Sequence, residues 1–116
     1  MKADDIRDFL KGFAEALQAG DADALDAHYA LPLILATRDG TTFVEDEEAL
    51  EQALAAELAA GRPTGFDAYE ITPLPDNAAR VRARWTLPNG TTAEKAYTLA
   101  EDDDGTIAIV AVEADG

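Results

Sequence analysis

Asp67, Lys95 and Tyr97 are the residues of this sequence whose types and spacing could do acid–base chemistry. Lys95 and Tyr97 are two positions apart on an expected strand and therefore share one face, to which strand pairing adds Asp67 and Trp85. A carboxylate whose pKa is raised by burial could act there as a general base, with the Tyr97 hydroxyl as donor. In the alternative interpretation, Asp67 and Lys95 lie at wet strand ends and pair or extend into water.

Residue types that the sequence lacks exclude several kinds of chemistry. Without Ser or Cys, the chain cannot form Ser-His-Asp or Cys-His nucleophiles, disulfides or thiolate metal sites. Its one histidine, His28, cannot supply the two or three imidazoles of a zinc site, and a partly buried helical position is its more common role. The 8 glycines form no phosphate loop, and the acidic segment 101–105 lacks the ligand spacing of a calcium loop. We expect neither a metal nor a cofactor.

The charge balance excludes further partners. The 116 residues include 9 Lys and Arg against 24 Asp and Glu, for a formal net charge of −15. The phosphates of a nucleic acid or of an anionic membrane would therefore be repelled. The apolar runs fall far short of the roughly 20 residues that a membrane helix needs, and the N-terminus turns acidic at Asp4 rather than continuing as a signal peptide. We expect one domain over residues 1–116, and the lack of Cys fits the cytoplasm.

Hydrophobic spacing predicts helices first and strands last. Leu50, Leu54 and Leu58 form the apolar seam of the third helix, and Pro32 is expected to end the second. The expected helices are Asp4–Ala19, Ala22–Ala30 and about Asp46–Ala60. The expected strands are Leu33–Thr37, Thr41–Val44, Gly65–Leu74, Ala79–Leu87, Thr91–Ala100 and Thr106–Glu113. This order is typical of an α+β fold with a mainly antiparallel sheet.

Two proline-containing turns predict how the later strands pair. The turn at 88–90 suits a three-residue hairpin loop with Gly90 in the left-handed conformation, and the turn at 75–77 is similar, with Asn77 in that position. The first turn predicts the pairs Trp85 with Ala93, Val81 with Tyr97 and Arg84 with Glu94. The second predicts the pairs Ile71 with Val81, Tyr69 with Ala83, Asp67 with Trp85 and Glu70 with Arg82.

These pairs give the sheet two unlike faces. The face expected to meet the helices carries apolar and aromatic side chains with two charges among them: Tyr69, Ile71, Val81, Ala83, Trp85, Leu87, Tyr97 and Leu99, with Asp67 and Lys95. The opposite face carries Arg80, Arg82 and Arg84 beside Glu70 and Glu94. Paired opposite charges on strands contribute only about 0.2–1 kcal/mol each. This face therefore suits water or a polar partner, and we expect a homodimer to form through it.

Three segments carry a resemblance to a known family. They are the segment Ala16–Leu25, the dipeptide Tyr29-Ala30 and the turn Asp39-Gly40. With the order of helices and strands, the chain resembles the NTF2-like superfamily, which includes SnoaL-like polyketide cyclases and ketosteroid isomerases. The resemblance implies a cystatin-like cone in which three N-terminal helices pack on a strongly curved, mainly antiparallel sheet.

The catalytic positions of the ketosteroid isomerases are mostly unfilled here. Their oxyanion donor is a tyrosine on the first helix, and the matching residue is Phe13, which has no hydroxyl. Their general base is an aspartate before the first hairpin turn, and the match is Thr37. Their second donor is a protonated aspartate, matched by Tyr97, which could still donate. The resemblance therefore does not imply isomerase activity.

Three functions stay open at this point. The first is binding of a small apolar molecule, without catalytic residues, in a pocket lined by Phe13, Tyr29, Tyr69, Trp85, Lys95 and Tyr97. The second is a SnoaL-like isomerase, cyclase or dehydratase acting on a small carbonyl compound, with Asp67 or Asp39 as base and Tyr97 as donor. The third is a non-catalytic association domain. We favour the first, because the superfamily's known catalytic set is incomplete.

Overall fold

The computed structural model describes residues 1–59 and 61–114. It begins with α1 (Ala3–Ala19), whose buried residues are Ile6, Leu10, Phe13, Ala16 and Leu17. Their three- and four-residue spacing puts them on one side of the helix, as predicted. The helix ends at Gly20, which has a φ of 67° and donates its N–H to carbonyls of the last turn.

The second helix is shorter than predicted. α2 (Ala22–Asp26) begins at Asp21, whose carboxylate accepts the backbone N–H of Ala24 at 3.2 Å. The prediction that it continues to Ala30 is wrong, because Tyr29 already pairs with Ile109 in the sheet and Ile109 donates its N–H to the carbonyl of His28. Sheet hydrogen bonds replace the helical ones from Tyr29 onward. The strand expected to begin at Leu33 therefore begins four residues earlier, at Tyr29.

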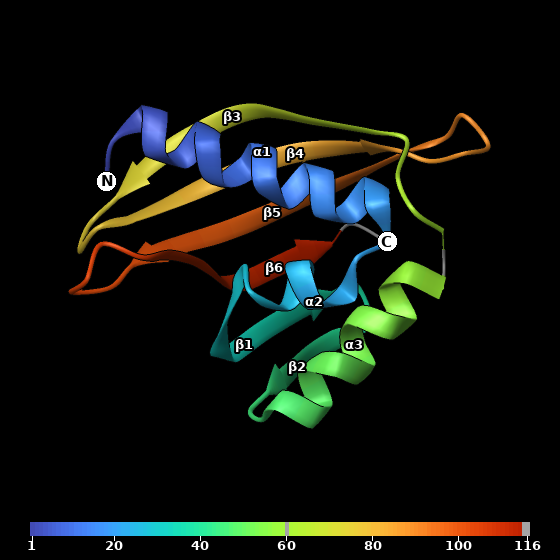
Figure 1. Cartoon of the computed structure of the whole chain (residues 1–116), viewed down its shortest axis with the longest axis horizontal. Helices are drawn as coiled ribbons and strands as arrows, with labels where there is room; N and C mark the ends of the chain where they lie inside the picture. Colours follow the sequence, from blue (N-terminus) through green and yellow to red (C-terminus); the bar gives the residue numbers. More distant parts are fainter. Residues whose placement is uncertain (60, 115–116) are drawn as a thin grey trace.

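The strands form one sheet, and the helices cover one of its faces (Figure 1). The structure has the six-stranded order β2-β1-β6-β5-β4-β3, antiparallel except for the β1/β6 pair. The bounds are β1 (Tyr29–Thr37), β2 (Gly40–Val44), α3 (Glu47–Ala59), β3 (Gly65–Leu74), β4 (Ala78–Thr86), β5 (Thr92–Glu101) and β6 (Ile107–Ala114). In Figure 1, α1 lies along β3 and β4, whereas α3 lies beside β1 and β2. The predicted α+β class is confirmed. The predicted last residue of α3, Ala60, lies outside the described residues.

The register of β4 and β5 follows the turn at 88–90 as predicted. Trp85 pairs with Ala93, and Val81 pairs with Tyr97. The same register sets Arg84 opposite Glu94 on the outer face, the face away from the helices. Trp85 and Tyr97 are consequently buried on the inner face.

The register of β3 is correct near its turn and wrong beyond it. Ile71 pairs with Val81 as predicted, but a bulge at Tyr69 shifts every earlier residue of the strand by one position. Phe66 therefore pairs with Trp85, and Asp67 pairs with Arg84 instead. A one-residue shift exchanges the two faces of a strand, so an aromatic ring replaces a carboxylate on the inner face. The bulge thereby avoids the cost of burying an unpaired charge.

Candidate functional site

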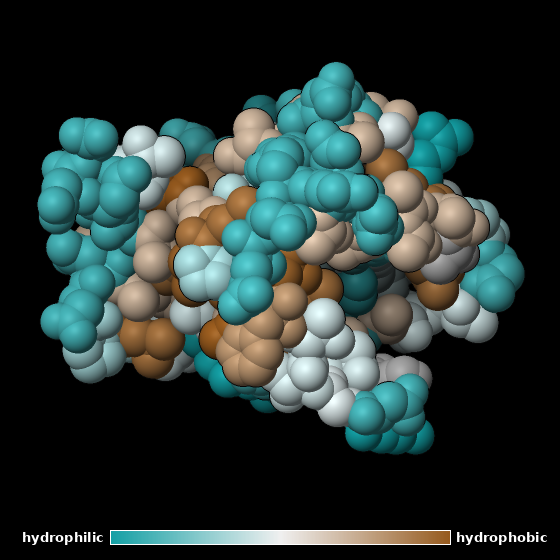
Figure 2. Space-filling view, turned by 90° about the horizontal axis from the view of Figure 1, so that it is seen from below, coloured by the Kyte–Doolittle hydropathy of each residue, from teal (hydrophilic) through white to brown (hydrophobic). Residues whose placement is uncertain are grey.

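A cavity of about 200 Å³ lies between α3 and the part of the sheet formed by β1, β5 and β6. Its walls are mainly apolar, with a polar group at one end and the C-terminal residue of β1 at the edge. The lining residues are Tyr29, Leu33, Leu35, Ala36, Thr37, Leu50, Ala53, Leu54, Glu57, Lys95, Val112 and Ala114. Viewed from the side of β2 and α3, the molecule shows apolar surface and a recess between hydrophilic groups (Figure 2).

Lys95 and Glu57 form the polar end of this cavity. The Lys95 ammonium donates to Glu57 Oε1 at 2.8 Å, and the side chains of Lys95 and Glu57 are only 16% and 23% exposed. The ammonium also lies 3.7 Å from the centre of the Trp85 ring. An aromatic face attracts a cation electrostatically, most strongly where water is partly excluded. The ring and the carboxylate together hold this lysine in one position at the cavity.

Two tyrosines stand near this ion pair. Tyr97 is buried, and its hydroxyl accepts a hydrogen bond of 2.9 Å from Trp85 Nε1–H. Burial raises the pKa of Tyr97 well above its ordinary value, and the neighbouring Tyr29 and Glu57 raise it further. Burial also raises the pKa of Tyr29, again with a contribution from Glu57. Both phenols therefore remain protonated at neutral pH and can serve as donors but not as bases.

Aromatic side chains fill the interior next to the cavity. Phe13 is fully buried and packs edge-on against Tyr97 and Phe66, with ring centres 5.3 and 5.9 Å apart. Phe13 lies 6.0 Å from the ring of Tyr29, so its ring backs the cavity instead of lining it. These rings fill the interior behind the cavity that lies under α3.

The predicted acid–base group does not assemble. Asp67 is exposed on the outer face opposite Arg84, because of the bulge in β3. Asp39 is exposed in the turn between β1 and β2, where its N–H donates to Thr37 Oγ1 at 3.3 Å. Neither carboxylate lines the cavity, so the expectation that Asp67 faces Trp85 and Tyr97 is wrong.

Of the predicted binding residues, Tyr69 is the one on the wrong face. It is 42% exposed, and its hydroxyl donates to Glu94 Oε2 at 2.7 Å beside the Arg84 guanidinium. Tyr29 and Lys95 line the cavity. The Trp85 ring lies beneath the lysine, and its N–H is hydrogen-bonded to Tyr97. Phe13 lies behind them.

Glu57 is a site residue that the sequence analysis did not identify. It follows Leu54 by three positions and Leu50 by seven, so it occupies the apolar side of α3. A carboxylate on the predicted seam of a helix is the sequence signal that would have drawn attention to it. Thr37, at the position that matches the isomerase base, also lines the cavity but has no acidic group.

A second, larger cavity is an open groove of about 560 Å³ between α1 and β3. Its floor is partly apolar, but exposed charged side chains of α1, among them Arg7, Lys11 and Glu15, form much of its wall. Openness to solvent weakens the binding of a small molecule, since well-formed sites bury most of the ligand surface. The smaller cavity under α3 is therefore the better candidate.

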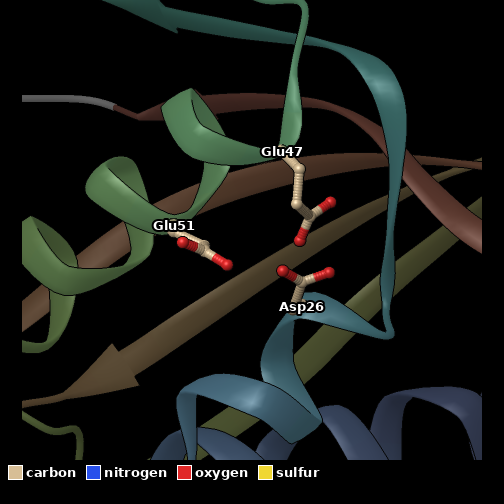
Figure 3. Close-up of side chains that lie close together, drawn as sticks. All are labelled: Asp26, Glu47 and Glu51. Atoms are coloured by element: carbon tan, nitrogen blue, oxygen red, sulfur yellow. The ribbon is translucent and has the colours of Figure 1, made fainter.

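Three carboxylates gather at the surface between α2 and α3: Asp26, Glu47 and Glu51 (Figure 3). One oxygen from each lies within 4.8 Å of the others. A hydrogen bond with Asp26 raises the pKa of Glu47 above its ordinary value of 4.5, and burial and the charges of Asp26 and Glu51 add to this. The hydrogen bond from Glu47 to Asp26 and the repulsion among the three acids thus both favour the protonated form of Glu47.

Comparison with solved structures identifies the class of fold. The fold closely matches that of an NTF-2 like protein of unknown function from Shewanella oneidensis MR-1, with a TM-score of 0.79, 26% identity and 100% of each chain covered. A DUF4783 family protein from Bacteroides fragilis YCH46 matches with a TM-score of 0.74 and 18% identity, over 90% of this chain and 94% of that one. These likenesses define a cystatin-like, NTF2-like domain.

The family follows from the sequence itself. Residues 3–115 match the family described as NTF2-like protein (DUF6841), and the chain belongs to that family. The resemblance predicted from the sequence is therefore confirmed. A search of curated proteins finds no match. Among solved structures, a putative calcium/calmodulin dependent protein kinase II association domain from Xanthomonas campestris is also similar, with a TM-score of 0.73, 18% identity and coverage of 100% of this chain and 88% of that one.

Proposed function

We propose that this protein binds a small apolar molecule in the cavity under α3. The observation that supports this is a partly enclosed space of about 200 Å³ with apolar walls and one localised polar group. Binding sites for small molecules commonly combine a predominantly apolar lining with a few polar groups that orient the ligand. Here the walls are supplied by leucines of β1 and α3 and by Val112, and the polar group is the Lys95–Glu57 pair.

Binding is better supported than acid–base catalysis. Glu57 is the one carboxylate of the cavity among the described residues, and it is engaged by Lys95. A general base must lie within hydrogen-bond reach of the proton it removes, and Asp67 and Asp39, the carboxylates expected to act as base, lie outside the cavity. Thr37 and the two protonated tyrosines cannot take that role at neutral pH.

A substitution that fills the cavity tests the proposal. Ala53 lines the cavity, whereas Ala56, on the same helix, is exposed. We expect Ala53→Phe to abolish binding of small apolar compounds and Ala56→Phe to leave it unchanged. Binding is measured by ligand-observed NMR, and the fluorescence of Trp85, the one tryptophan of the chain, locates it. Equal binding by both variants would place the ligand elsewhere, and no binding to the parent protein would refute the proposal.

A second candidate function is self-association through the outer face of the sheet. Ile34 and Phe43 pair across β1 and β2, and their side chains are 40% and 65% exposed. Exposed apolar pairs of this kind mark interaction surfaces more often than isolated residues do. The similarity to the putative kinase association domain from Xanthomonas campestris points in the same direction.

A further inference from the structure

We propose that the cavity under α3 selects an uncharged molecule whose polar end accepts hydrogen bonds, and the chemical class that fits is a short-chain ketone, aldehyde or ester. This inference rests on the proposed binding function and specifies the chemical class of the ligand. Three features of the cavity support it: its unused donors, the balance of its charges, and its size.

The polar end of the cavity presents hydrogen-bond donors that have no protein acceptor. An ammonium carries three N–H donors, and one of those of Lys95 is directed at Glu57 Oε1. Within residues 1–59 and 61–114, no other protein acceptor bonds to the Lys95 ammonium, and the Tyr29 hydroxyl forms no hydrogen bond with the protein. Both groups line the cavity, and the ammonium can only donate, so a ligand that meets it must supply an acceptor atom.

The charges at the same place disfavour an ionised ligand of either sign. Glu57 already neutralises Lys95 at 2.8 Å. A bound carboxylate would lie next to Glu57 in a chain whose net charge is −15, and like charges at close range in a partly buried site repel strongly. A bound ammonium would meet Lys95, which already occupies the cation position over the Trp85 ring. A neutral acceptor meets neither difficulty.

The volume limits the apolar part of the ligand. The cavity measures about 200 Å³, below the roughly 300–1,000 Å³ of sites that hold drug-sized molecules. The leucines and Val112 around it form a lining suited to a short alkyl chain. A four-ring compound of steroid size does not fit without displacement of α3.

A matched series of seven-carbon probes tests the class. We would titrate the full chain with 2-heptanone, heptanoate and heptylamine by ligand-observed NMR at pH 7. The expected order places 2-heptanone first, with at least about a fivefold weaker affinity for each charged probe, since burying an uncompensated charge costs more than one hydrogen bond contributes. Trp85 fluorescence reports whether each probe lies near the ion pair.

Substitutions of the donors complete the test. Lys95→Met keeps an unbranched side chain over Trp85 but removes the donors, and Tyr29→Phe removes the hydroxyl. Each is expected to weaken 2-heptanone binding by about fivefold or more, whereas Lys11→Met, in the open groove of α1, leaves it unchanged. Thermal unfolding of each variant confirms that it folds.

The outcomes separate this inference from the function on which it rests. If heptanoate or heptylamine binds as well as 2-heptanone, or if the donor substitutions have no effect, the ligand class is overturned while binding in the cavity stands. If none of the three probes binds, and no other apolar compound alters Trp85 fluorescence, the proposed function fails and the ligand class fails with it.

Discussion

At the scale of single residues, the hydrogen bond between Trp85 and Tyr97 joins the core to the cavity. The indole N–H donates to a buried phenol oxygen at 2.9 Å, and the Lys95 ammonium lies over one face of the indole ring. A buried donor without an acceptor is costly, so the tyrosine hydroxyl stabilises the position of the tryptophan as well as supplying an aromatic ring.

Tyr97→Phe is therefore expected to destabilise the protein. It leaves Trp85 Nε1–H buried without a partner, at a cost of about 1–3 kcal/mol in the free energy of unfolding. Urea unfolding followed by Trp85 fluorescence measures the loss. Tyr69→Phe is the matched control, since its hydroxyl bonds to Glu94 in contact with solvent and its removal is expected to cost less. Equal losses in the two variants would mean that the buried bond contributes nothing beyond a surface one.

At the scale of elements, α3 brings both favourable and unfavourable contacts. Its inner side covers the cavity and carries Glu57 to Lys95, whereas its N-terminal part places Glu47 and Glu51 beside Asp26 of α2. Carboxylates near a helix N-terminus are favoured by the helix dipole. Three of them close together nevertheless repel one another when all are ionised.

This cluster predicts a dependence of stability on pH. The pKa of Glu47 is raised in the folded chain, so the folded state binds a proton more tightly than the unfolded state does. The associated stability is present below the ordinary value of 4.5 and is lost as the pH rises through the folded pKa. We expect Asp26→Asn to flatten this decline and to raise the free energy of unfolding at pH 7.

Urea unfolding between pH 4 and pH 7 measures the effect. Asp23→Asn removes the same charge from an exposed position of α2 outside the cluster, so it should keep the slope of the parent protein. If Asp26→Asn shows that same slope, the three carboxylates do not interact in solution.

At the scale of the whole molecule, the net charge of −15 limits how two copies can meet. Most of the surface of one copy repels that of another, and a contact is feasible where charges balance. On the outer face of the sheet, Arg80 pairs with Glu113 at 2.8 Å and Arg84 with Glu94 at 2.9 Å.

None of the described helices is long and apolar enough to cross a membrane.

The association candidate predicts an effect of one apolar residue on oligomeric state. If the outer face joins two copies, Phe43→Asp should convert a dimer to a monomer in sedimentation velocity, because it puts a charge into the contact. Thr42→Asp adds the same charge on the opposite side of β2 and should leave the dimer intact. A parent protein that is monomeric at high concentration and in high salt would rule out this second function.

The sequence by itself determined the elements and much of the sheet. The apolar seam of α1 and the turn at 88–90 act over a few residues, so propensity and turn geometry were enough to place them. The same local rules placed Trp85, Lys95 and Tyr97 on the inner face, whereas Tyr29, expected in the second helix, lies in β1. The resemblance to the NTF2-like superfamily is confirmed by the family match.

Only the tertiary structure decided the end of α2, the bulge at Tyr69 and the position of Glu57. Each depends on a partner far away in the sequence: β6 pairs with Tyr29, the inner face accepts Phe66 in place of Asp67, and Lys95 receives the carboxylate of α3. Local patterns carry no information about such partners. The free energy of burying a ring instead of a charge, or of pairing two charges, enters only when the chain folds back on itself. Turn geometry therefore placed Trp85, Lys95 and Tyr97 correctly on the inner face. The outer-face positions of Asp67 and Tyr69 and the ion pair of Glu57 could not be predicted.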